Sequence, residues 1–315
     1  VVVDPKVLLD EIKYIKEKGI NPKLIVSDRA HVIMPYHINL DNALSNHQGN
    51  LAAGSTGKGI APVYADKMFR NGIRMIDLLD PNVFEEKLKK GYLFSKKIIE
   101  GALLQKFDIS IHDILKNYLH YGEQLSSYIC DTSVELYTAY QNGKSILFEG
   151  AQGISLDVDH GIYPFTTSSN TATGHISAGT GVTFRTINRV IGVVKGYLSR
   201  VGESPLPSEI NGTDAELLRT KGGEYGTTTG RPRRIGWLDL VQVRQAVRVN
   251  GLTEIALTKL DILNNYKALN VCVSYDIEGE RVDEMPASLE KYRKSKPVYK
   301  TLPGWDSLPE KVWEK

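Results

Sequence analysis

The sequence predicts an α/β fold with a mainly parallel central sheet, a helical insertion and a mixed α+β C-terminal part. The β-branched run Val1 to Val3 is followed by a helical pattern and then by the apolar segment Lys23 to Asp28, the order of a strand–helix–strand unit. Residues from about 30 to 140 are mostly helical in pattern. Further on, ALNVCVSYDIEGERV predicts a hairpin that turns at Glu278 and Gly279.

The individual elements are predicted from caps and apolar spacing. Asp4 can cap a first helix, Pro5 suits its first position, and Gly19 can end it. Two further helices are expected in DPNVFEEKLKKGYLFSKKIIEGALLQ and in LDLVQVRQAVRVNG, the latter ending at Gly251. Strands are expected in SILFEG (145–150), RVIGVVKGYL (189–198) and EIALTKLD.

These elements predict three domains. The central-sheet domain comprises residues 1–28 and 129–195, the helical insertion residues 29–128, and the C-terminal α+β domain residues 196–315. The chain opens VVVDPKVLL without a methionine and stops at SLPEKVWEK, which resembles the first turn of a helix. We therefore expect an internal piece of a longer protein, with a processed complete protein as the alternative.

Composition excludes several classes of function. A net charge of +2 is too small to favour a nucleic-acid partner. Cys130 and Cys272 provide neither a disulfide framework nor zinc spacing, so two reduced cytosolic thiols are expected. No signal peptide and no apolar run of membrane-spanning length occurs. We expect a cytoplasmic protein that binds no membrane.

The segment TTTGRPRR, Thr227 to Arg234, is a candidate anion site. Arg231, Arg233 and Arg234 would repel one another unless an anion or a carboxylate lies between them. A hydrogen bond to a charged group contributes about 1.5–3 kcal/mol, and arginine offers a bidentate fork to carboxylate or phosphate. A solvated basic turn is the alternative.

Three further loops carry candidate groups. GSTGKG (54–59) is not a P-loop, because the first glycine of that motif would fall on Ala52 and Lys58 is followed by glycine, but its backbone could still hold a phosphate. In EGAQG, Gln152 follows a predicted strand, where open α/β sheets bind ligands. In DVDHGIYPFTTSSNTATG, Asp157, Asp159 and His160 allow a metal site, although the hydroxyls suit phosphate or sugar better.

The segment TKLD (258–261) is a weak candidate for recognition of a base. One carboxylate, Asp261, could accept hydrogen bonds from the N1–H and the amino group of guanine. Adenine lacks that pair of donors and would be rejected.

Taken together, these loops resemble the adenylosuccinate synthetase family. The resemblance covers essentially the whole chain and rests on GSTGKGIAPVYADKMFR, LFEGAQGISLDVDHGIYPFTTSSNT, RVGESPLPSE, EYGTTTGRPRRIGWLD and LTKLDIL, in the order of the family. It implies a magnesium-assisted, GTP-dependent ligase that joins IMP to L-aspartate in purine (AMP) biosynthesis. In that reaction GTP phosphorylates O6 of IMP, and the aspartate amine displaces the phosphate.

The resemblance also implies roles in IMP binding. Thr56 and Thr167 are expected near the IMP phosphate, and Gln152 near O6. Arg70 is expected to reach the IMP of a neighbouring subunit, which makes the protein a homodimer. Lys67 lies in the lysine signature of the family, so Lys67 and Gln152 are the catalytic candidates.

The other two substrates are assigned in the same way. Arg231 is expected to touch both IMP and aspartate, and Arg233 both aspartate and GTP. Guanine is expected at three consecutive residues, Lys259, Leu260 and Asp261. The full loop expected around aspartate consists of Thr227, Thr228, Thr229, Gly230, Arg231 and Arg233.

The chain also departs from the family. Ala61, Lys58 and the pair Glu203–Ser204 differ from the usual residues, and Glu203 is expected to pair with Arg200. The Gly-Asp-Glu-Gly-Lys-Gly-Lys loop of the family, which holds the GTP phosphates, the base and Mg²⁺, does not occur in the 315 residues, and neither does the acid histidine that follows it. We expect no metal ligand in this chain and no turnover by it alone. A non-catalytic nucleotide-binding remnant is the alternative.

Overall fold

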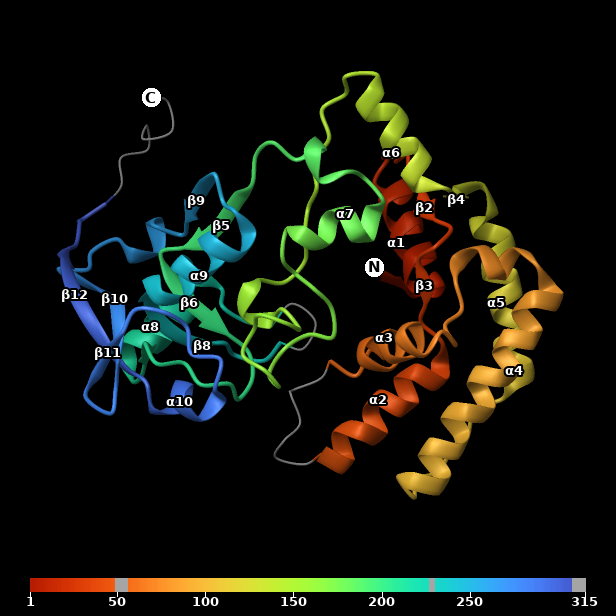
Figure 1. Ribbon diagram of the computed structural model, residues 1–315, viewed down its shortest axis with the longest axis horizontal. Helices are drawn as coiled ribbons and strands as arrows, with labels where there is room; N and C mark the ends of the chain where they lie inside the picture. The colour runs from red at the N-terminus through yellow and green to blue at the C-terminus, as the bar shows by residue number, and fades with distance from the viewer. Residues whose placement is uncertain (49–55, 227–229, 308–315) are drawn as a thin grey trace. The chain divides into compact units, whose positions relative to one another are not determined.

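The computed structural model describes residues 1–48, 56–226 and 230–307 (Figure 1). Internal contacts divide the chain into two compact units. Unit 1 comprises Val1–Glu149 and Ile176–Thr186, and unit 2 comprises Gly150–His175 and Ile187–Lys315. This division reflects only how many contacts lie within each unit, and it does not test the three predicted domains, which remain a prediction.

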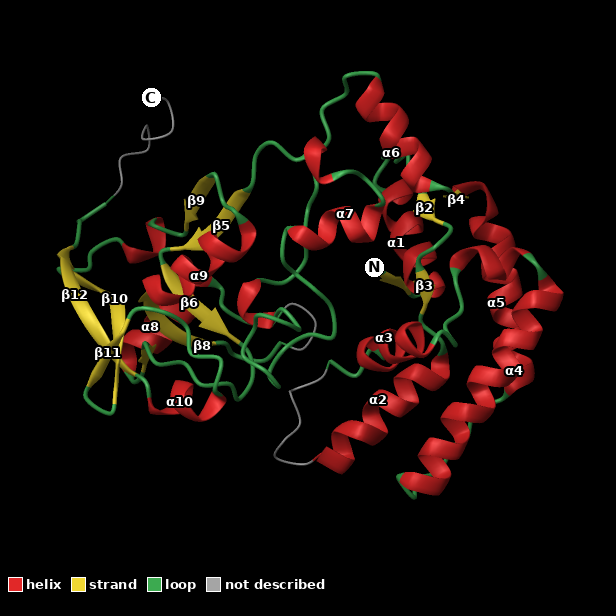
Figure 2. Cartoon of the chain, viewed as in Figure 1, coloured by secondary structure: helices red, strands yellow, loops and turns green. Residues whose placement is uncertain are grey.

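Unit 1 is mostly helical (Figure 2). Its helices are α1 (Pro5–Glu17), α2 (Pro35–Gln48), α3 (Ile60–Phe69), α4 (Pro81–Lys97), α5 (Ile111–Leu125), α6 (Thr132–Gln141) and most of α7 (Gly174–Thr180). Its short strands are β1 (Val2–Val3), β2 (Val26–Ser27), β3 (His31–Val32) and β4 (Ile129–Cys130). The predicted cap is confirmed, since Asp4 accepts hydrogen bonds from the N–H groups of Lys6 and Val7 at 3.0 and 3.2 Å.

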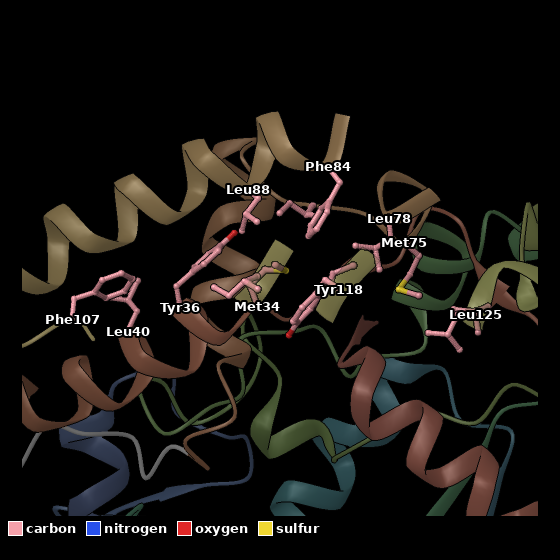
Figure 3. Packing of buried hydrophobic residues seen from close by; sticks show 14 of the residues in the cluster. Met34, Tyr36, Leu40, Met75, Leu78, Phe84, Leu88, Phe107, Tyr118 and Leu125 are labelled. Carbon is pink, nitrogen blue, oxygen red and sulfur yellow. The ribbon is translucent and has the colours of Figure 1, made fainter. Parts of the chain in front are cut away.

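One apolar cluster joins α1, α2, α4 and α5 of unit 1. Figure 3 shows residues from α2, α4 and α5 that point toward one another. Tyr36, Phe84, Leu88 and Leu125 are fully buried there. Helix α3, which carries the predicted site residue Lys67 and is capped by Arg70, packs against α2 and β3.

Parallel pairing of strands occurs in both units. β1 pairs with β3 and β2 with β4, while β5 (Ile191–Lys195) pairs with β9 (Glu254–Thr258) in unit 2. The strand predicted for residues 145–150 is wrong: that segment is irregular, and Leu147 is 89% exposed. Apolar side chains alone do not make a strand, because its backbone needs a neighbouring strand with which to pair.

Unit 2 is built on a mixed sheet of the order β11-β10-β8-β6, with β12 on β10 and β7 on β8. The bounds are β6 (Tyr197–Arg200), β7 (Glu209–Ile210), β8 (Arg234–Asp239), β10 (Ala268–Ile277), β11 (Glu280–Val282) and β12 (Lys296–Pro303). The accompanying helices are α8 (Thr213–Gly222), α9 (Leu240–Asn250) and α10 (Leu289–Lys294). The predicted hairpin at Glu278–Gly279 is confirmed as β10 and β11, and so is the α/β class.

No helix within the described ranges combines the length and the apolar character needed to cross a membrane. Cys130 is half-buried and Cys272 is buried, and both are free thiols.

Candidate functional site

The two ends of the arginine-rich segment pair with each other, so the chain reverses direction there. We call residues 224–234 the arginine turn. Tyr225 and Pro232 form an antiparallel bridge, and the N–H of Arg233 donates to the carbonyl of Glu224 at 2.9 Å. Gly230 is exposed and has a φ of +63°, in the left-handed region that glycine adopts without strain. Thr227, Thr228 and Thr229 lie outside the described residues.

Carboxylates from the chain itself hold Arg233 and Arg234. Arg233 Nη1 lies 2.8 Å from Glu224 Oε2. Arg234 donates through Nε to Glu209 at 2.7 Å and through Nη1 to the carbonyl of Ser204 at 2.7 Å. Arg233 and Arg234 are thus each held by a separate carboxylate of the chain, and Arg234 has a structural role. Arg231 is exposed at the rim of the turn.

Glu224 is the electrostatic centre of this region. Its side chain is only 1% exposed, and Lys195 Nζ lies 2.7 and 2.8 Å from its two oxygens. Burial alone would raise the pKa of Glu224, but hydrogen bonds from Lys195, Tyr197 and Ser199 outweigh it and lower that pKa to about 2. The carboxylate is therefore ionised at neutral pH and balances two cations.

The predicted base-binding segment lies against the same region of unit 2. Lys195 at the end of β5 pairs in register with Thr258 at the end of β9, directly before Lys259. Lys259 has a φ of +61°, and its Nζ donates to the carbonyl of Gly222 at 3.0 Å. The structure thus brings Lys259 to the end of α8, where the arginine turn begins.

The rest of that segment has two different environments. Leu260 is half-buried, and one of its methyl groups lies 3.1 Å from the position that a Cβ on Gly196 would occupy. Asp261 is exposed and begins a short 3₁₀ turn, Asp261–Leu263. Its carboxylate can therefore meet a ligand, whereas the Leu260 side chain packs inward.

Gln152 and Thr167 lie on one loop of unit 2. Gln152 is exposed with a φ of +63°, and the N–H of Thr167 donates to the carbonyl of Leu156 at 2.8 Å. The buried Asp157 organises this loop by accepting hydrogen bonds from the backbone N–H groups of Asp159, His160, Thr171 and Ala172. These bonds occupy the carboxylate internally, which argues against the alternative of a metal site there.

The remaining predicted residues lie in unit 1. Thr56 is exposed, and the N–H of Gly59 donates to Asp41 at 2.9 Å, so that N–H does not face a phosphate. Lys67 is half-buried on α3, with its Nζ 5.6 Å from the ring centroid of Tyr64. Arg70 is exposed and caps α3 with a φ of +65°.

Sequence reasoning missed Glu224 and Lys195, and it considered Asp157 only as a possible metal ligand. The signal for Glu224 was the arginine cluster itself, since such a cluster requires a counter-charge. The predicted pair of Glu203 with Arg200 is wrong: Arg200 Nη2 donates to the carbonyl of Phe165 at 2.8 Å, and the charge of Glu203 acts on Arg234. Proximity in sequence did not determine the partner.

Comparison with known proteins gives consistent matches over this fold. A family model described as adenylosuccinate synthetase matches residues 1–314. The enzyme of that name from Listeria monocytogenes is 48% identical over 305 residues, covering 96% of this chain and 71% of the relative. The Bacillus cereus enzyme is 47% identical over 320 residues, covering 98% of this chain and 74% of the relative.

A solved structure agrees with these matches. The fully ligated adenylosuccinate synthetase from Plasmodium falciparum superposes with a TM-score of 0.90 at 33% identity, covering 97% of this chain and 72% of that one. The fold and the matches define a GTP-dependent ligase of purine biosynthesis. The chain belongs to the adenylosuccinate synthetase family.

Proposed function

We propose that this chain carries the IMP, L-aspartate and guanine contacts of the ligation that forms adenylosuccinate. In this reaction the terminal phosphoryl group of GTP is transferred to O6 of IMP. The aspartate amine then forms the new C–N bond at C6 as phosphate leaves. The observation that carries the proposal is the junction in unit 2, where the arginine turn and the Lys259–Asp261 segment meet at the end of α8.

The arginine turn is proposed to hold aspartate. Arg231 and Arg233 would bind its carboxylates, with Arg231 also touching IMP and Arg233 also touching GTP. Gly230 leaves room at the rim, and the three threonines Thr227 to Thr229 complete the proposed loop. Asp261, with Lys259 and Leu260, would hold guanine.

The IMP contacts are proposed at Thr56, Gln152 and Thr167. Gln152 both donates and accepts hydrogen bonds, so it can orient the purine carbonyl that becomes phosphorylated. Lys67 is proposed as a catalytic cation because it is a half-buried ammonium group in the lysine signature.

A homodimer is proposed because Arg70 would contact the IMP of a neighbouring subunit. Its surroundings support an interface: Phe69 and Phe94 make an edge-to-face contact with centroids 6.3 Å apart, although their side chains are 60% and 40% exposed. Met68, beside them in sequence, is 69% exposed. Exposed aromatic and methionine side chains are enriched where subunits meet. A cytoplasmic location, which the two free thiols support, belongs to the same proposal.

The family depends on Mg²⁺, and the described residues do not fit that ion. No group of three or more His, Cys, Asp or Glu residues gathers as a metal site in residues 1–48, 56–226 and 230–307. The Mg²⁺ ligands are proposed to lie in the family's glycine-rich N-terminal loop, a motif that these 315 residues do not contain.

Replacement of Asp261 tests the guanine assignment. An asparagine can accept one hydrogen bond from the guanine edge but not two, so Asp261→Asn should lower kcat/KM for GTP about a hundredfold. Xanthosine triphosphate presents an N1–H and a 2-oxo group, which an amide can match, so its use should rise. Asp283→Asn, at another exposed aspartate, is the control. Unchanged use of GTP by Asp261→Asn in the full-length protein would refute the assignment.

A further inference from the structure

We propose that Glu224 is a positioning residue that holds the substrate-binding cation Arg233 in place and joins the arginine turn to the base-binding end of β9. This inference rests on the proposed function of Arg233 and Lys259. It adds a residue that touches no substrate itself and acts through its neighbours.

Both oxygens of the Glu224 carboxylate accept hydrogen bonds from other residues of this chain. Oε1 accepts from Lys195 Nζ at 2.7 Å and from the hydroxyl of Tyr197 at 2.7 Å. Oε2 accepts from Lys195 Nζ and from Arg233 Nη1, both at 2.8 Å. With both oxygens engaged and the side chain only 1% exposed, Glu224 does not reach a ligand.

The backbone around Glu224 fixes the same two elements. Its carbonyl accepts from the N–H of Arg233 at 2.9 Å, so both the main chain and the side chain of Arg233 are held by one residue. Two residues earlier, the carbonyl of Gly222 accepts from Lys259 Nζ at 3.0 Å. A Cβ on Gly222 would lie 2.2 Å from the Tyr197 hydroxyl, so the 222–224 segment is tightly packed against β6.

The charge balance explains why a carboxylate is needed. The side chains of Lys195 and Arg233 are 30% and 27% exposed, so water screens their mutual repulsion only in part. A single buried negative charge between them holds the Arg233 guanidinium group in one orientation. This reduces the rearrangement needed when an anionic ligand binds. A neutral residue of the same size would leave two cations facing each other.

The test is steady-state kinetics of the full-length protein with Glu224→Gln. We expect the KM for GTP to rise about tenfold, the loss expected when one charge-assisted hydrogen bond no longer orients a ligand-binding group, and the KM for aspartate to rise with it. Because Gln152 and Thr167 lie on a different loop and Glu224 contacts Arg233 rather than Arg231, the KM for IMP should rise less than the KM for GTP. Glu224→Asp keeps the charge but withdraws it from Arg233 by one methylene, so it should raise the KM for GTP severalfold and less than Glu224→Gln.

The matched control is Glu209→Gln, since Glu209 on β7 holds the neighbouring Arg234, a structural arginine at the start of β8. It should leave the KM for GTP unchanged. The inference is overturned if Glu224→Gln lowers only the melting temperature or kcat, or if Glu209→Gln raises the KM for GTP equally. If Glu224→Gln does not fold, a wild-type KM in Glu224→Asp overturns it.

Arg233→Gln separates this inference from the proposed function. A raised KM for GTP in Arg233→Gln with a normal one in Glu224→Gln refutes only the positioning role. Normal values in both refute the assignment of Arg233 as well.

Discussion

The imidazole Nε2 of His37 lies 3.0 Å from the carboxylate of Asp66, and both side chains are buried in unit 1. The other ring nitrogen accepts a hydrogen bond from the N–H of Met34 at 3.0 Å, so Nε2 carries the proton and donates to Asp66. Burial lowers the pKa of His37 despite the neighbouring carboxylate, so the ring is neutral. This bond joins α2 to α3 directly before Lys67.

Removal of the carboxylate should destabilise unit 1. Asp66→Ala leaves a buried N–H of His37 without an acceptor, which costs about 1–3 kcal/mol of unfolding free energy. Urea denaturation followed by circular dichroism measures this loss. Asp10→Ala removes an exposed carboxylate on α1 and should leave the denaturation midpoint unchanged. Equal midpoints for Asp66→Ala and wild type would contradict a structural role for the bond.

Arg70 tests the proposed dimer. Because its side chain is exposed, Arg70→Leu should leave the melting temperature unchanged and raise the KM for IMP about tenfold. Lys89→Leu, at an exposed lysine on α4, is the control. Mixing Arg70→Leu subunits with Gln152→Ala subunits should restore activity, because one site in each mixed dimer has both groups intact. Normal use of IMP by Arg70→Leu would refute the shared site.

His31 should make stability depend on pH. Burial, and then the charges of Lys67 and Arg74, lower the pKa of His31 from 6.5 to about 4. As pH falls from 6.5 to 4, the unfolded chain binds a proton that the folded chain excludes, so stability falls by up to about 3 kcal/mol. The slope of unfolding free energy against pH should be shallower in His31→Gln. His120→Gln, at an exposed histidine, should keep the wild-type slope. Parallel curves for His31→Gln and wild type would count against this prediction.

The 315 residues alone are expected to make no adenylosuccinate from IMP, GTP and aspartate. Phosphoryl transfer depends on positioned charges around the phosphates, and the family's glycine-rich loop does not occur in this sequence. A phosphate-release assay with the 315-residue chain beside the full-length protein provides the measurement. Turnover by the shorter chain would disprove the expectation, and micromolar IMP binding without turnover would favour the nucleotide-binding remnant.

Local signals predicted several elements well. The Asp4–Pro5 start of α1, the end of α9 at Gly251 and the turn at Glu278–Gly279 follow from cap and turn chemistry within a few residues, and all are present. The segment 145–150 failed because strand formation depends on a distant partner that no local pattern reveals.

Some features of the site likewise follow from the sequence, and others depend on the tertiary structure. The sequence by itself determined the chemistry: three arginines within four residues, an aspartate after a predicted strand and a glutamine among small residues, in an order that matches one family. Only the tertiary structure decided which arginine is held by which carboxylate, and that Glu224, Lys195 and Lys259 converge at the end of α8. The physical reason is that an ion pair depends on distance in space and on burial, and both are set by how remote segments pack rather than by their spacing along the chain.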